Sequence, residues 1–139
     1  MKTIGLDLGS VTCGISISDA LGWIAQALTT VRFAEDDYDD ALNKVIAVCK
    51  EQKVIDIVLG LPKHMNGDIG IRGEICLAFK DKLEAQGYNV TMWDERLTTA
   101  AAQRILIGAD VSRKKRKKVI DQMAAVQILQ SYLDAKSLR

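Results

Sequence analysis

Apolar and polar residues alternate through Thr3–Leu8 and again through Cys13–Ser18, which is the period of a β-strand. The short connection over residues 9–12 predicts a tight hairpin between these two strands. After a turn, the run Trp23–Val31 predicts a third strand. The opening of the chain is therefore expected to form a three-stranded antiparallel meander.

From Asp39 the apolar residues recur at i, i+3, i+4 and i+7, which predicts an amphipathic helix that ends near Lys53. The next run is almost wholly apolar, as in a strand that is covered on both faces. The pattern predicts the following later elements: a strand over Val54–Leu59, a helix over Ile71–Ala85, a strand over Val90–Trp93, a short helix from Thr98 or Thr99 to Gly108, and a last helix over Ser112–Leu133.

This order of elements predicts an α/β fold with one mixed five-stranded sheet flanked by helices. With 139 residues, 48% hydrophobic and 27% charged, the chain fits a single domain over residues 1–139. No apolar run reaches the ~20 residues needed to cross a bilayer, so no membrane contact is expected. The three cysteines lack a C-x-x-C pair, which favours reduced, mostly buried thiols in a cytoplasmic protein.

Asp7 is unusual because aspartate is depleted in strands, and this one lies in mid-strand with Gly5 and Gly9 on its own side. It is either a structural carboxylate bonded to turn amides or a basic side chain, or a metal ligand or general base. In the second case, we expect the glycines to leave room for a substrate to approach the backbone.

Asp121 is unusual for a similar reason, because Ala124, Ala125 and Ile128 share its side of the last predicted helix. Small alanines would let this helix lie close to the sheet and bring Asp121 near the first strand. A lone charge among apolar neighbours is costly, so a metal ion or a cationic partner is expected. An ordinary salt bridge at the helix rim is the alternative.

Asp94 and Glu95 follow a predicted strand, where ligands commonly bind in open α/β sheets. Successive residues point to opposite sides, so we expect only one of the two to join Asp7 and Asp121. Three such carboxylates would suit Mg²⁺ or Mn²⁺, which take oxygen ligands and support phosphodiester hydrolysis.

A run of six basic residues opens the last predicted helix, where the macrodipole disfavours cations. One interpretation is that the phosphate backbone of a nucleic acid neutralises this run. The alternative is that the run is only a solvated charged surface. Lys63 and Arg96 are two further candidates for contacts to phosphate, whereas His64 is set aside as a surface histidine. The candidate nucleic-acid contacts are thus Lys63, Arg96, Arg113, Lys114, Lys115, Arg116, Lys117 and Lys118.

Four motifs together resemble the YqgF (or RuvX) family, which is described as Holliday-junction resolvases or pre-16S rRNA nucleases. They are GLDLGSVTCGISISD at Gly5–Asp19, GLPKHMNG at Gly60–Gly67, DERLTT at Asp94–Thr99 and KKVIDQMAA at Lys117–Ala125. The resemblance implies an RNase H-like fold, the bacterial cytoplasm, and metal-dependent nuclease chemistry. Carried over residue by residue, it implies Asp7, Glu95 and Asp121 as catalytic metal ligands, and the choice of Glu95 over Asp94 rests on it.

The resulting hypothesis is a two-metal-ion endonuclease that hydrolyses phosphodiester bonds in structured RNA, at the 5′ end of pre-16S rRNA in ribosome biogenesis. One alternative is a resolvase of DNA Holliday junctions in recombination, which two cooperating subunits would suit, whereas a monomer would suit RNA trimming. Another is a non-catalytic RNA-binding factor in ribosome assembly or transcription. The hairpin after Asp7 also resembles the phosphate loop of the sugar-kinase and actin superfamily, in which two such domains close around ATP.

Overall fold

The computed structural model of the protein describes residues 1–63, 69–95 and 113–137, with the backbone alone for 113–122. Each strand follows from a run of alternating or apolar residues, and each helix from apolar residues at helical spacing. The strands are β1 (Thr3–Leu8), β2 (Thr12–Ser18), β3 (Ala25–Arg32), β4 (Asp56–Leu61) and β5 (Asn89–Asp94), and the helices are α1 (Tyr38–Gln52), α2 (Gly70–Ala85) and α4 (Arg113–Ser137).

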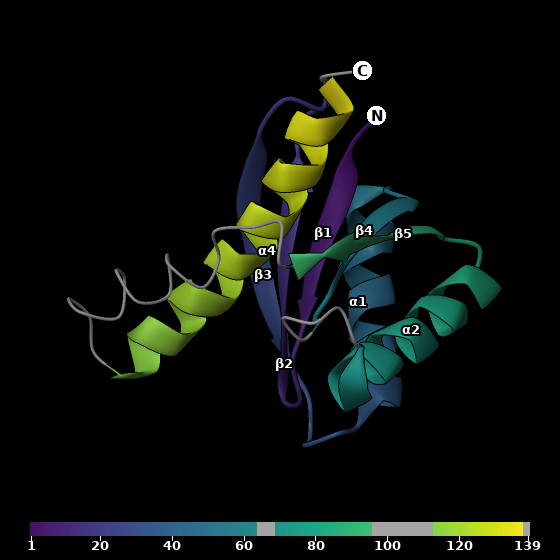
Figure 1. The fold of residues 1–139 in the computed structure, drawn as a ribbon, viewed down its shortest axis with the longest axis vertical. Helices are drawn as coiled ribbons and strands as arrows, with labels where there is room; N and C mark the ends of the chain where they lie inside the picture. The colour runs from purple at the N-terminus through teal and green to yellow at the C-terminus, as the bar shows by residue number, and fades with distance from the viewer. Residues whose placement is uncertain (64–68, 96–112, 138–139) are drawn as a thin grey trace.

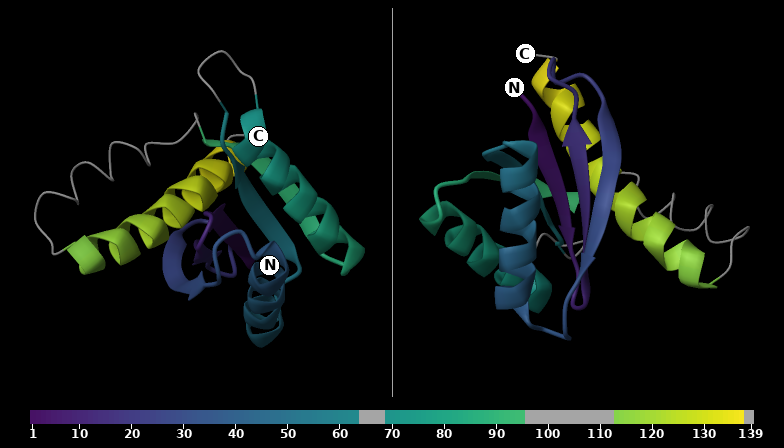
Figure 2. Two further views of the ribbon diagram at one scale, coloured as in Figure 1. Left: turned by 90° about the horizontal axis from the view of Figure 1, so that it is seen from below. Right: turned by 180° about the vertical axis from the view of Figure 1, so that it is seen from behind.

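The five strands form one mixed sheet in the order β3-β2-β1-β4-β5. The β1–β2 and β2–β3 pairs are antiparallel, whereas β1–β4 and β4–β5 are parallel. The helices α1 and α2 lie against one face of the sheet and α4 crosses the other, as Figure 1 and Figure 2 show. This arrangement confirms the predicted α/β fold with a three-stranded meander. None of the helices described is long and apolar enough to cross a bilayer.

Two strands begin two residues later than the sequence predicts, because side-chain and helix-end contacts hold the preceding backbone. Before β3, the Asp19 carboxylate accepts the N–H groups of Trp23 at 2.7 Å and Ile24 at 3.1 Å, so these residues belong to the turn. Before β4, Lys53 ends α1 in the left-handed conformation, and the Val54 N–H donates to the Cys49 carbonyl. The predicted helix from Thr98 or Thr99 to Gly108 lies outside the described residues.

The sheet separates two apolar clusters. The larger lies between the sheet and α1 and α2, and it contains Ile4, Leu6 and Leu8 from alternate positions of β1. The smaller lies under α4 and contains Val58 of β4 with Ile128, Leu129 and Leu133 of the helix. The three cysteines are buried and free, as the sequence predicts: they are Cys13, Cys49 and Cys76.

The helix α4 lies so close to the sheet that Gly5 of β1 has no room for a side chain. A Cβ atom there would lie 2.5 Å from the Ser16 Oγ and 2.7 Å from the Leu129 Cβ. At the same point, the Ser16 hydroxyl donates to the Ala125 carbonyl at 2.7 Å. The small residues thus let α4 lie close to the sheet, as predicted for Ala125. The expectation that Gly5 leaves room for a substrate is wrong, because the helix fills that space.

We therefore expect Gly5→Ala to destabilise the protein by about 1–3 kcal/mol, the usual cost of overpacking a filled interior. Neither the Ser16 hydroxyl nor the Leu129 side chain can withdraw without breaking the contact between α4 and the sheet. Urea denaturation followed by circular dichroism measures the change. An unfolding midpoint equal to that of the unsubstituted protein would show that the helix does not rest on Gly5.

Candidate active site

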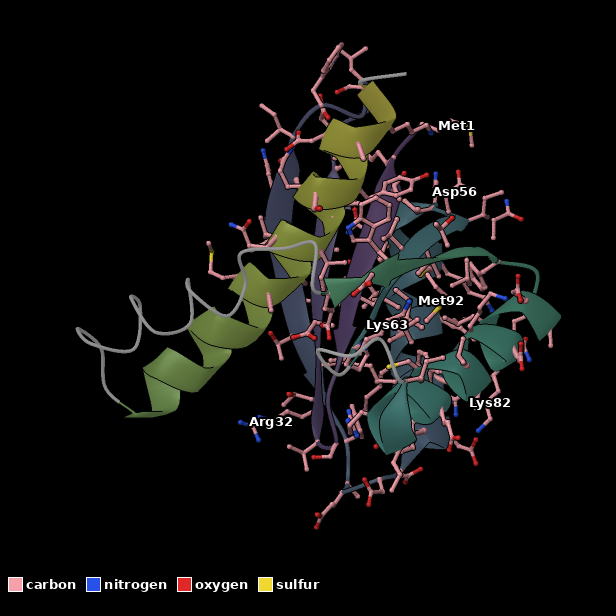
Figure 3. All side chains as sticks on the ribbon, in the orientation of Figure 1. Met1, Arg32, Asp56, Lys63, Lys82 and Met92 are labelled. Carbon is pink, nitrogen blue, oxygen red and sulfur yellow. The ribbon has the colours of Figure 1, made fainter. Side chains whose placement is uncertain are left out.

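The parallel strands β1, β4 and β5 end at the same edge of the sheet, where ligands commonly bind in open α/β sheets. Asp7 is the next-to-last residue of β1, Asp94 is the last residue of β5, and Glu95 follows it. Figure 3 shows Lys63, just beyond β4, at this edge, whereas Met1 and Asp56 lie toward the other ends of the strands. The candidate residues from separate motifs therefore meet at one edge.

Contacts between Trp93 and α4 fix the end of β5 in front of this edge. The Trp93 indole N–H donates to the Ser131 hydroxyl at 3.0 Å. Its ring packs edge-on against Tyr132, with 5.6 Å between the ring centroids and an interplanar angle of 87°. Because Trp93 immediately precedes Asp94 and Glu95, this packing fixes the backbone position from which the two acidic side chains extend.

The Glu95 carboxylate lies over Gly60 of β4, on the face of the sheet that α4 covers. A Cβ atom on Gly60 would lie 3.0 Å from the Glu95 Oε1 and 2.6 Å from the Ile128 Cδ1. In the β1–β4 register, Leu6 pairs with Leu59, so one further step places Asp7 beside Gly60. Asp7 also shares the face of Gly5, which contacts α4. The absence of a side chain at Gly60 thus lets the Glu95 carboxylate lie against β4, on the face that Asp7 shares.

The charges of both carboxylates affect the pKa of the buried Cys76 thiol in α2. Burial raises the pKa of Cys76 to about 12, the negative charges of Glu95 and Asp7 act in the same direction, and the positive charge of Arg72 opposes them. The charges of both acids thus act on the same buried thiol.

Asp94 lies beside a lysine that follows the end of β4. Its carboxylate lies 3.8 Å from the Lys63 ammonium, and the two side chains are 17% and 27% exposed. The neighbouring acids therefore have different partners: Asp94 faces Lys63, and Glu95 faces Gly60. This geometry separates the two residues that the strand pattern alone left equivalent.

Most of the other predicted site residues lie outside the described side chains. Arg96 belongs to a range that the structure does not describe, and so does His64, which the sequence analysis sets aside. The basic run 113–118 and Asp121 lie on the helical backbone of α4, and Asp121 precedes Ala125 by about one turn. Within the described part of the chain, no group of three histidine, cysteine or acidic side chains is placed to hold a metal ion.

Arg72 is a residue at this edge that the sequence reasoning missed. It lies in the first turn of α2, and its guanidinium donates to the Leu8 carbonyl and to the Tyr38 hydroxyl, both at 2.9 Å. A cation is disfavoured at a helix N-terminus, so its position there was a usable signal.

Two converging carboxylates suit hard divalent cations, since Mg²⁺ and Mn²⁺ prefer oxygen ligands. The amino-acid sequence matches over residues 1–135 a family model described as RuvX, Holliday junction resolvase. This chain belongs to the RuvX family. The match agrees with the four motifs noted in the sequence.

Two curated relatives cover nearly the whole chain. One from Staphylococcus epidermidis is 52% identical over 136 residues, which are 96% of each protein. One from Bacillus anthracis is 53% identical over 137 residues, which are 98% of this chain and 100% of the relative. Both carry the name "Putative pre-16S rRNA nuclease".

Two solved resolvase structures share the fold of this RuvX-family chain. Thermus thermophilus RuvC in complex with a Holliday junction substrate matches with a TM-score of 0.61 and 13% identity, over 99% of this chain and 96% of RuvC. Fowlpox virus resolvase in complex with Holliday junction DNA matches with a TM-score of 0.60 and 12% identity, over 98% and 99%. The likeness confirms the RNase H-like fold that the resemblance implied.

The raised pKa of Cys76 predicts a loss of stability at alkaline pH. Because its folded-state pKa of about 12 exceeds the usual 9.0, only the unfolded chain loses the proton as the pH passes 9. By pH 10 this difference lowers the free energy of unfolding by about 1.4 kcal/mol. Urea denaturation at pH 8 and pH 10 should show a fall that is larger in the unsubstituted protein than in Cys76→Ala. Equal falls in the two proteins would contradict the placement of Cys76 among buried and acidic groups.

Proposed function

We infer that this RuvX-family protein is a metal-dependent nuclease that cleaves phosphodiester bonds in structured RNA, at the 5′ end of pre-16S rRNA in the bacterial cytoplasm. The observation that carries this proposal is the convergence of Asp7 and Glu95 beside Gly60, at the edge where three parallel strands end. The family match and the names of relatives more than 50% identical over almost the whole chain support the substrate.

In this proposal, the carboxylates of Asp7, Glu95 and Asp121 hold Mg²⁺ or Mn²⁺. Bound there, the ions would supply a water of lowered pKa and would stabilise the negative charge that develops on the phosphate. Asp7 and Glu95 carry like charges on the same face of the sheet, and their repulsion would favour the binding of a divalent cation. Asp121 would approach from α4, which already rests on the sheet through Ala125.

The basic residues would hold the nucleic acid through its phosphates, an attraction that weakens as salt rises. Arg96 and the run Arg113–Lys118 provide most of this charge. Lys63 forms an ion pair with Asp94 at 3.8 Å, so a contact between Lys63 and phosphate would compete with that ion pair. Asp94 would then orient Lys63 and leave Glu95 to the metal ion.

A DNA Holliday junction is the second candidate substrate, because the family model is described as a resolvase. Junction cleavage requires two cuts related by symmetry, so it favours a homodimer, whereas trimming of an RNA end suits a monomer. The same purified protein can be tested on both substrates.

We predict that the purified protein cleaves a pre-16S rRNA fragment with Mg²⁺ or Mn²⁺, and that chelation of the metal abolishes cleavage. Asp7→Asn and Glu95→Gln should each lower the rate about a thousandfold, since metal-ion catalysis contributes several kcal/mol. Asp94→Asn is the matched control because it removes a neighbouring charge on the other side of the strand end. It should retain cleavage within about tenfold of the unsubstituted rate.

Cleavage of RNA by Asp7→Asn at the unsubstituted rate would contradict the proposed mechanism. If a four-way DNA junction is cut and the rRNA fragment is not, the second candidate substrate replaces the first. Binding of RNA without any cleavage would indicate the non-catalytic assembly factor. Loss of activity in Asp94→Asn equal to that in Glu95→Gln would show that the two acids are assigned wrongly.

A further inference from the structure

We propose that Arg72 is a positioning residue for the active site, which fixes the backbone immediately after Asp7 and thereby the direction of that carboxylate. The proposal rests on the proposed function, because it gives Arg72 a role in forming the same metal site. It follows from where the guanidinium binds.

The guanidinium of Arg72 connects three elements that lie far apart in the sequence. One terminal nitrogen donates to the carbonyl of Leu8, the last residue of β1, and the other donates to the hydroxyl of Tyr38 at the start of α1. The Tyr38 hydroxyl in turn donates to the Asp36 carboxylate at 3.1 Å. Arg72 therefore links α2 and α1 to the end of β1.

The Leu8 carbonyl is the point at which this link can direct Asp7. The pairing of β1 with β4 ends at Leu6 and Leu59, so Leu8 lies beyond it. On the other side, β1 turns at once into the hairpin, where the Gly9 N–H donates to the Thr12 carbonyl at 2.8 Å. The guanidinium thus supplies a donor for a strand end that the parallel neighbour no longer holds, one residue after Asp7.

The charge of Arg72 also suits this place. It lowers the pKa of the Cys76 thiol, whereas burial and the negative charges of Glu95 and Asp7 raise it. A cation in the first turn of α2 is disfavoured by the helix dipole, and the two hydrogen bonds that the guanidinium donates at 2.9 Å offset that cost. Both terminal nitrogens already donate to protein acceptors, and this favours a role in positioning over direct contact with a phosphate.

Arg72→Lys tests the proposal because it keeps the positive charge and removes the planar fork that reaches two acceptors. Arg32→Lys is the matched control, since Arg32 is exposed at the end of β3. Four quantities are measured: the Kd for Mn²⁺ by calorimetry without nucleic acid, kcat and KM for RNA cleavage, and Tm. Tyr38→Phe provides a second variant, which removes one acceptor and leaves Arg72 in place.

We expect Arg72→Lys to weaken Mn²⁺ binding by about tenfold or more, as loss of groups that orient metal ligands usually does. In that variant kcat falls while KM for RNA stays near the unsubstituted value. Tyr38→Phe should shift the Kd for Mn²⁺ in the same direction by a smaller factor. Arg32→Lys should leave all four quantities unchanged.

Two results would overturn the assignment. An unchanged Kd for Mn²⁺ with a raised KM for RNA would make Arg72 a phosphate contact, and a lowered Tm alone would make it a purely structural residue. Asp7→Asn separates this failure from that of the proposed function. If Asp7→Asn loses Mn²⁺ binding and cleavage while Arg72→Lys keeps both, only the role of Arg72 is wrong. If Asp7→Asn also keeps both, the metal site itself is wrong.

Discussion

The close contact between α4 and the sheet is the constraint on which the site depends. Because Gly5 has no Cβ, the Ala125 carbonyl reaches the Ser16 hydroxyl at 2.7 Å. The same helix places Ile128 over Gly60, so the one glycine of β4 admits both the helix and the Glu95 carboxylate. A wider gap between helix and sheet would separate the elements that bring acids to this edge. The site therefore depends on two glycines, Gly5 and Gly60, which let α4 pack closely against the sheet.

Around that contact, opposite charges are distributed over several elements and not gathered on one loop. Burial raises the pKa of Cys76, the negative charges of Glu95 and Asp7 raise it further, and the positive charge of Arg72 lowers it. Lys63 forms an ion pair with Asp94 at 3.8 Å. In the proposed mechanism, a divalent cation would balance the negative charges of Asp7 and Glu95. The fold thereby gives the two neighbouring acids different surroundings: Asp94 lies beside Lys63, and Glu95 lies over Gly60.

Much of this could be predicted from the sequence, because periodicity is a local property. The strands, the hairpin and the fold class follow from alternating and helical patterns, and Asp7 is conspicuous in its own strand. The beginnings of β3 and β4 could not be predicted, since the Asp19 carboxylate and the end of α1 decide them. Arg72 was missed because its partners, Leu8 and Tyr38, are brought near it only by the tertiary fold. The different partners of Asp94 and Glu95 likewise depend on β4, a neighbour in space.

The central claim is that Asp7 and Glu95 together bind a divalent cation at the edge where the parallel strands end. The most direct measurement is the anomalous difference density of crystals grown with Mn²⁺. The account predicts a peak coordinated by carboxylate oxygens of both Asp7 and Glu95, with Asp94 still beside Lys63. A peak bound by Asp94 and not by Glu95, or no peak near Asp7 at saturating Mn²⁺, would contradict it.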